Sequence, residues 1–223
     1  MDHLPKWLRT VIHKLDFLAL PNLGILICAI GVMAYFAAMS GFSAVENFNF
    51  DPMAVRAGEW WRLFAFPFSD PGTLNQHPLF FVFSVLFTYF IFNSIEQQWG
   101  AAPLTIFVLI SYISTVAGAL ILERSTNIWY YVLLNVSLVF GTIFPNFEIL
   151  LFFILPVKAK WMTLFVAALL LFEFIIGSWV TKQFYLFALF PYFLFFGQYF
   201  VTEALTKLRI RKNRSRFDKD MWR

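Results

Sequence analysis

Six long apolar stretches alternate with short polar segments along the chain. They cover residues 23–40, 79–93, 104–122, 128–144, 161–178 and 184–201. A bilayer core about 30 Å thick is crossed by about 20 helical residues, so each stretch is a candidate membrane span, and the shorter ones require tilt or a thin membrane. The pattern predicts an all-α, polytopic membrane protein: a bundle of six transmembrane helices with one long loop, over residues 41–78, between the first two.

A seventh apolar segment, residues 147–155, is too short to cross a membrane. Pro145 and Pro156 bracket it, and proline interrupts helices. We therefore expect an interfacial or re-entrant piece between the fourth and fifth spans.

Composition excludes the main alternatives to a membrane protein. Hydrophobic residues make up 60% of the 223 residues and charged residues only 13%, against about 45–50% and about 25% in soluble domains. Disorder requires low hydrophobicity and is excluded too. The one cysteine, Cys28, cannot form an internal disulfide or a cysteine metal cluster. No cofactor and no metal site is predicted.

The basic residues are distributed unevenly over the two predicted sides of the membrane, which indicates the orientation. With six spans both termini share a side, and that side holds Lys6, Arg9, Lys14, Lys158, Lys160 and the basic residues after 204. The other side holds only Arg56, Arg62, Arg124 and Lys182. Since cytoplasmic loops are enriched in Lys and Arg, both termini are predicted to be cytoplasmic, in the cell (inner) membrane.

Three regions follow from this arrangement: a cytoplasmic amphipathic helix over residues 1–20, a membrane core over 21–204 and a basic tail over 205–223. In the first region one helical face is apolar and includes Trp7, Leu8, Val11, Ile12 and Leu15. That helix either lies on the cytoplasmic membrane surface or packs on the bundle. The tail is expected to flank the last span at the membrane surface, and no nucleic acid is predicted as a partner.

The long loop carries an unusual density of aromatic residues. Residues 58–68 read Gly-Glu-Trp-Trp-Arg-Leu-Phe-Ala-Phe-Pro-Phe. Trp60 and Trp61 are suited to the headgroup region, where Arg62 can bond lipid headgroups or loop carbonyls. An ordinary aromatic belt would explain the same residues.

This stretch resembles the Trp-Arg motif in the first loop of the rhomboid family of membrane proteins. Two further pieces agree with the resemblance: Glu96-x-x-x-Gly100 at the end of the second span, and residues 156–161 before the fifth. The resemblance covers nearly the whole chain and implies a rhomboid-like six-span fold. From the residues themselves, Glu96 is expected to pair with a basic flank or to accept backbone donors.

The catalytic dyad of active rhomboids is missing. Those enzymes use a serine at the start of the fourth span, set between glycines, and a histidine on the sixth. Here the serine position falls on Leu133 or Val136 and the histidine position on Phe190 or Leu194. The resemblance therefore implies a pseudoprotease, not an enzyme, that binds transmembrane segments of client membrane proteins between the second and fifth spans, with a role in quality control, trafficking or degradation.

Polar residues inside the spans complete the candidate client-binding set of Trp60, Trp61, Arg62, Glu96, Asn135, Ser137 and Glu173. Asn135 and Ser137 either line a polar site or bond neighbouring helices. Glu173 is either functional, or is protonated and bonded to a neighbouring helix, or reaches the outer interface.

Two other functions are considered. One is an intramembrane serine protease in which His77 activates Ser137, and the other is a transporter or channel that uses Glu173. Besides client helices, the lipid bilayer itself is an expected partner.

Overall fold

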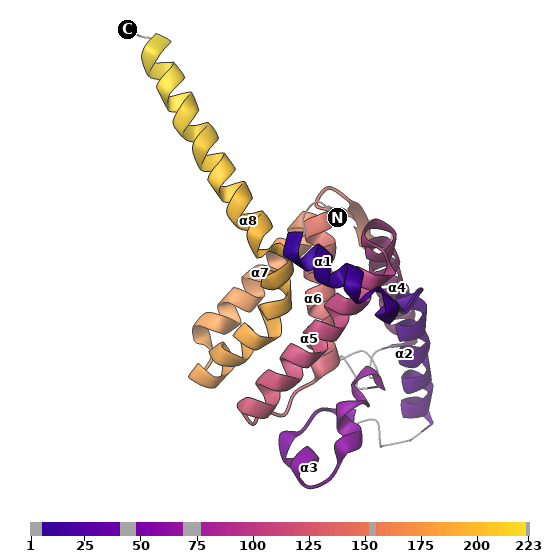
Figure 1. The fold of residues 1–223 in the computed structure, drawn as a ribbon. Helices are drawn as coiled ribbons and strands as arrows, with labels where there is room; N and C mark the ends of the chain where they lie inside the picture. Colours follow the sequence, from indigo (N-terminus) through magenta and orange to yellow (C-terminus); the bar gives the residue numbers. More distant parts are fainter. Residues whose placement is uncertain (1–5, 41–47, 69–76, 152–154, 222–223) are drawn as a thin grey trace.

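The computed structural model describes residues 6–40, 48–68, 77–151 and 155–221, and most of them are helical (Figure 1). Helices cover all six predicted stretches: α2 (Leu23–Met39), α4 (Pro78–Trp99), α5 (Ala101–Ile121), α6 (Ile128–Ile143), α7 (Ala159–Ile176) and α8 (Trp179–Met221). The described part of the chain is thus an all-α bundle, apart from one small hairpin.

Five helices among the described residues are long and apolar enough to cross a membrane: α2 with the residues just before it, α4, α5, α7 and α8. This is the architecture of a multi-pass integral membrane protein. The sixth predicted crossing depends on α6, which has 16 residues and a rise of about 24 Å. That helix is apolar but shorter than a usual span.

Helix α6 lies at the centre of the bundle. Most of its side chains are buried, including Val132, Val136 and Val139, and it packs against α4, α5, α7 and α8. In contrast, α7 lies at the periphery, where it buries Ala159 and Leu170 and exposes most of its other apolar side chains. Exposed apolar side chains are expected where a helix faces lipid.

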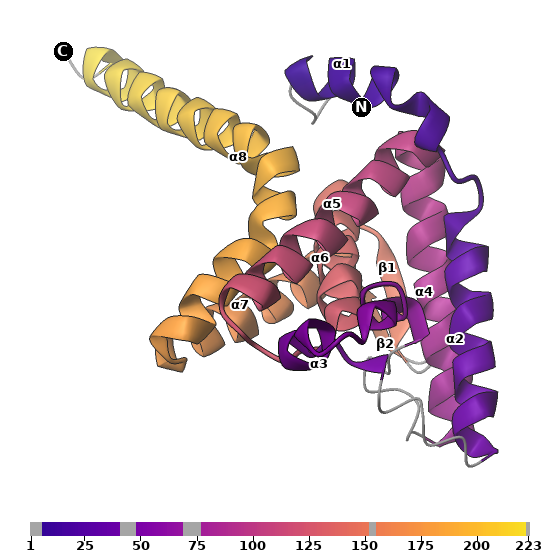
Figure 2. The same ribbon diagram turned by 60° about the horizontal axis from the view of Figure 1, so that its bottom comes forward.

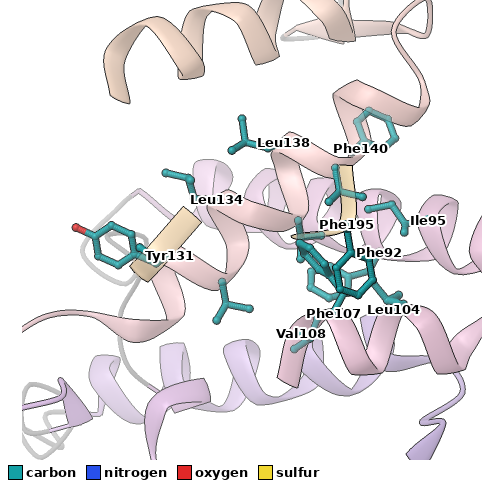
Figure 3. Close-up of a cluster of buried hydrophobic side chains, with 14 of the residues drawn as sticks. Phe92, Ile95, Leu104, Phe107, Val108, Tyr131, Leu134, Leu138, Phe140 and Phe195 are labelled. Carbon is teal, nitrogen blue, oxygen red and sulfur yellow. The ribbon is translucent and has the colours of Figure 1, made fainter. Parts of the chain in front are cut away.

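Aromatic rings fill the core near one end of α6. Figure 3 shows Phe92 of α4, Phe107 of α5 and Phe195 of α8 gathered beside Leu104. The centroids of Phe107 and Phe195 are 5.0 Å apart with their planes at 84°, an edge-to-face geometry that aromatic pairs prefer. The core therefore joins helices from both halves of the chain.

Helix α8 contains Pro191, and the helix is bent, with its C-terminal part projecting from the bundle (Figure 2). Proline has no N–H, so the Phe187 carbonyl four residues earlier loses its helical partner. The Ser114 hydroxyl of α5 donates to this carbonyl at 2.6 Å. The Asn135 side chain of α6 donates to the next carbonyl, that of Ala188, at 2.8 Å. Three helices are thereby joined at the proline.

Small residues on α5 allow this close approach. A Cβ added to Gly118 would lie 2.6 Å from the Cβ of Phe187, so any larger residue would push α8 away. Ser111, one turn before Ser114, is fully buried. Ser111, Ser114 and Gly118 thus form a small-residue face of α5, and its contacts with Phe187 pack it against α8.

The N-terminal helix α1 (Lys6–Lys14) and the 3-10 turn η1 (Asp16–Leu18) pack against α5. Leu8 and Ile12 are buried in the main core. These contacts agree with the alternative in which the amphipathic helix packs on the bundle. Residues 1–5 of the predicted region lie outside the described residues. At the other end of the chain, α8 runs on to Met221, so the predicted boundary between 204 and 205 lies within a helix, because Lys and Arg are good helix formers.

Residues 147–155 were expected to form an interfacial or re-entrant piece, and their neighbourhood contains an antiparallel hairpin of β1 (Glu148–Leu151) and β2 (Leu155–Lys158). Ile149 pairs with Val157 across the hairpin. The two short strands satisfy part of each other's backbone hydrogen-bonding groups where Pro145 and Pro156 prevent a helix.

We predict that Ser114→Ala lowers the free energy of unfolding by about 1 kcal/mol, because the Phe187 carbonyl then lacks a donor. In the Pro191→Ala background the same change should lower the free energy of unfolding by only about a few tenths of a kcal/mol, since alanine at position 191 restores the helical N–H. Unfolding by SDS in mixed micelles, followed by helical circular dichroism, measures both values. Thr202→Ala is the control, because its hydroxyl is exposed and donates within α8. Equal losses in the two backgrounds would contradict this account of the kink.

Candidate functional site

A cavity of about 120 Å³ lies between α4 and α7, with α6 as its floor. Its walls are mainly apolar: Phe87, Ile91, Ser137, Leu138, Phe140, Ile149, Ala159, Met162, Thr163 and Val166. A cavity of about 150 Å³ in a protein core can hold benzene. The space between α4 and α7 is therefore suited to one apolar side chain.

Two hydroxyl groups line this cavity, and both donate within their own helices. Ser137 Oγ donates to the Leu133 carbonyl at 2.9 Å, and Thr163 Oγ1 donates to the Ala159 carbonyl at 3.0 Å. A hydroxyl that donates in this way can still accept a hydrogen bond. The cavity therefore combines apolar walls with two oxygen acceptors.

A tight contact between α6 and α7 sets the position of the α7 wall. A Cβ added to Gly141 would lie 1.6 Å from Thr163 Oγ1 and 2.7 Å from Thr163 Cβ. Only glycine permits this approach. Because Thr163 also lines the cavity, the same contact holds the α7 wall against α6.

The β1–β2 hairpin forms another wall. Ile149 of β1 lines the cavity, and just before the strand the Phe147 ring lies 5.2 Å from that of Phe90 on α4 and 6.0 Å from that of Phe140 on α6. The hairpin itself carries an exposed ion pair between Lys158 and Glu148, at 3.9 Å. It is thus held against α4 and α6 by aromatic contacts.

The predicted residues of the long loop lie away from this cavity, on the 3-10 turn η3 (Trp60–Leu63), which follows the short helix α3 (Pro52–Arg56) and precedes the turn η4 (Phe66–Phe68). Arg62 pairs with Glu59 at 2.5 Å, donates to the Asn49 carbonyl at 3.1 Å and lies 5.0 Å from the centre of the Trp61 ring. Arg62 thus bonds a loop carbonyl, as one of its two predicted alternatives states. Trp60 is 64% exposed, as an interfacial anchor would be.

Glu96 lies in the last turn of α4 and caps the start of another helix. Its Oε1 accepts the N–H of Asn22 at 2.7 Å. Asn22 precedes α2 with a left-handed backbone, so Glu96 joins the start of α2 to the end of α4. Gly100, with φ of 96°, makes the turn from α4 directly into α5, a conformation that glycine adopts easily. Of the two alternatives for Glu96, acceptance of a backbone donor is correct.

Asn135 and Ser137 point in different directions from α6. Asn135 is fully buried and donates to the carbonyls of Tyr131 and Ala188, which is the helix-bonding role. Ser137 lines the cavity between α4 and α7. Two residues along a helix differ by about 200° in direction, so the pair does not form a joint polar site.

Glu173 is exposed on α7, about one turn before the helix ends at Ile176. Its Oε2 accepts a hydrogen bond from the Tyr185 hydroxyl of α8. Glu173 is absent from the lining of the cavity between α4 and α7. The seven candidate residues therefore do not come together in one place.

The structure does not bring His77 to Ser137. His77 precedes α4, where its Nδ1 accepts the N–H of Leu79 at 3.3 Å. Ser137 lies beside Phe87 and Ile91 of the same helix, and Phe87 is ten residues along α4 from His77, a rise of about 15 Å. Within the described residues no group of three or more His, Cys, Asp or Glu side chains could hold a metal ion.

Sequence reasoning missed the residues that shape the cavity, chiefly Thr163, Ile149 and Gly141. Their signals in the sequence were weak. Thr163 is a single threonine early in an apolar span, and Gly141 is a single glycine within another. The contact that gives them meaning joins residues far apart in the chain.

The chain was compared with protein-family models, with curated proteins and with solved structures, and none of the three comparisons found a match.

Gly141→Ala should lower the free energy of unfolding by about 1–3 kcal/mol, because the added methyl group forces α7 away from α6. Thr163→Ala in the same chain should recover part of the loss by removing the clashing hydroxyl. SDS unfolding of the purified protein measures the effect. Gly31→Ala in α2 is the matched control, since nothing lies within 4 Å of its added Cβ. Equal stability of the two alanine variants would contradict a tight contact between α6 and α7.

Proposed function

We propose that the protein is a rhomboid-like pseudoprotease of the cell membrane. It holds a transmembrane helix of a client protein between α4 and α7 and leaves the client intact. The observation that carries this proposal is the small apolar cavity between those two helices, which the resemblance implies as the place of client entry and which Ser137 and Thr163 line.

The size of the cavity defines the mode of binding. About 120 Å³ accepts one large apolar side chain but not a helix. The client helix lies across the opening and inserts a Leu or Phe side chain, as a knob enters a hole. Close contact of membrane helices is favoured by small residues beside the knob. Clients therefore carry Gly, Ala or Ser one turn from a large apolar residue.

The absence of cleavage follows from the proton of Ser137. A serine nucleophile needs a base that removes its proton. The Ser137 proton is directed to the Leu133 carbonyl, which is not a base, and no histidine is among the residues that line the cavity. A bound client would thus meet no activated nucleophile.

The arrangement of the helices supports the proposed topology of six crossings with cytoplasmic termini. Helix α1 and the C-terminal part of α8 lie toward the same end of the bundle (Figures 1 and 2). Both segments are rich in Lys and Arg, which favours the cytoplasmic side. In this topology α6 crosses as the shortest span, and the membrane around it is thinned or α6 is shielded by its neighbours.

Photo-crosslinking tests client binding. The full-length protein, with benzoylphenylalanine in place of Met162, is reconstituted in nanodiscs with a biotinylated Leu/Ala transmembrane peptide that has a central Phe and a Gly one turn away. We expect at least about five times more crosslinked peptide than with the same probe in place of Leu164. Leu164 is on the same helix but about 200° around it and exposed. Ser137→Phe, which fills the cavity, should reduce crosslinking from Met162 to the Leu164 level. Equal crosslinking at the two positions would contradict the proposal.

The lack of proteolysis has its own test. The peptide recovered after a long incubation with the purified protein should have its full mass in mass spectrometry, and a fluorophosphonate probe should leave Ser137 unlabelled. Cleaved peptide, or labelling that disappears in Ser137→Ala, would show an active serine protease instead.

A further inference from the structure

A second and larger cavity, about 330 Å³ in volume, lies on the other side of α7, between α7 and α8. Its walls include Ala167 and Leu170 of α7 and Leu186, Leu189 and Phe193 of α8. The rim faces outward, because Leu186 is 64% exposed and Phe193 56% exposed. In a bilayer this cleft is open to lipid. Leu138 and Thr163 line both this cleft and the client cavity, whereas Ser137, Met162 and Val166 line the client cavity and not the cleft.

The shape of the cleft fits a lipid tail. Along α8 the lining extends from Tyr185 to Phe193, eight residues or about 12 Å of helix rise. The hydrocarbon depth of one leaflet is about 15 Å. At the end of the cleft near Phe193, the polar groups are paired within the protein, since the Tyr192 hydroxyl lies 2.7 Å from Thr142 Oγ1. A hydrocarbon chain along the cleft would therefore meet apolar side chains and satisfied hydroxyls.

The carboxyl group of Glu173 lies beside the other end of the cleft, next to Tyr185. Tyr185 lines the cleft and donates its hydroxyl hydrogen to Glu173, which lies about one turn before the end of α7. Among the described residues, Glu173 has no ion-pair partner. A carboxylate at the edge of a membrane is costly unless a cation or water compensates it. A cationic group of a bound lipid would supply that compensation.

A basic residue lies near the same end of the cleft. Lys182 precedes Tyr185 by three residues on α8, so their side chains are neighbours on the helix surface. A carboxylate bonded to Tyr185 and an ammonium group one turn before Tyr185 match a headgroup that has both a cation and a phosphate. Among such headgroups, a primary ammonium can also donate hydrogen bonds to the carboxylate, whereas a trimethylated one cannot.

We propose that the cleft between α7 and α8 binds an amine-headgroup phospholipid. One acyl chain lies along α8 from Tyr185 to Phe193. The primary ammonium of the headgroup donates to the Glu173 carboxylate, and its phosphate lies toward Lys182.

Native mass spectrometry of the full-length protein in detergent tests this site. Phosphatidylethanolamine, phosphatidylcholine and phosphatidylglycerol with identical acyl chains are titrated in turn. Wild type should bind phosphatidylethanolamine about ten times more tightly than the other two lipids, since a hydrogen bond to a charged group corresponds to about a tenfold change in affinity. Equal affinity for phosphatidylethanolamine and phosphatidylcholine would overturn the proposal.

Variants separate the headgroup contact from the cleft. Glu173→Gln keeps an acceptor for Tyr185 and should abolish the preference without loss of helical structure. Glu123→Gln is the control, because that carboxylate is exposed and paired with Arg56 at 2.5 Å. This variant should keep the preference for phosphatidylethanolamine. Leu189→Trp should weaken the binding of all three lipids, because the larger side chain fills the cleft. A preserved preference in Glu173→Gln, or unchanged binding in Leu189→Trp, would reject the site. Ser137→Phe should leave lipid binding unchanged, which keeps this test independent of client binding.

Discussion

The hydrogen that Pro191 does not carry determines how the central helices meet. Without it, the Phe187 carbonyl must find a donor from another helix, because no water is available inside a membrane. Ser114 of α5 supplies that donor, and Asn135 of α6 binds the neighbouring Ala188 carbonyl. The approach that these bonds require is possible because Gly118 presents no side chain to Phe187. A defect in one helix thus becomes the junction of three.

The two cavities follow from how unevenly α7 is held. On one side, Gly141 lets Thr163 come into direct contact with α6. Beyond that contact, α7 leaves space toward α4, where Ser137 forms part of the floor, and a larger space toward α8, where Tyr185 meets Glu173. Each space has one open side and a small set of polar groups. This combination allows α7 to serve a client helix on one face and a lipid on the other, as proposed.

The polar residues of the chain illustrate why a motif does not by itself reveal a role. Arg62 is held by Glu59 and the Asn49 carbonyl, and Glu96 caps the start of α2. Both have structural partners that account for them. Ser137 and Glu173 differ, since one faces a cavity and the other has a neutral partner in Tyr185. The proposed functions therefore depend on these two residues and on the spaces beside them.

Local pattern sufficed for most of the helical architecture. Apolar runs of the right length predicted the positions of α2, α4, α5, α6, α7 and the start of α8, because a membrane helix satisfies its own backbone and needs no distant partner. The small-residue face of α5 is also visible in the sequence, since Ser111, Ser114 and Gly118 stand at helical spacing and share one side. The hairpin was not, because Pro145 and Pro156 indicated only an interruption of the helix and not the pairing of Ile149 with Val157.

Which faces meet was decided by tertiary structure. The sequence shows that Gly141, Ser137, Thr163 and Glu173 exist, but their meaning depends on contacts between segments far apart in the chain. Whether Ser137 faces a cavity, and whether Glu173 meets a tyrosine, is set by the rotation and tilt of neighbouring helices. Those angles result from side-chain packing across the whole bundle. Lengths and periodicities of single helices carry no information about them.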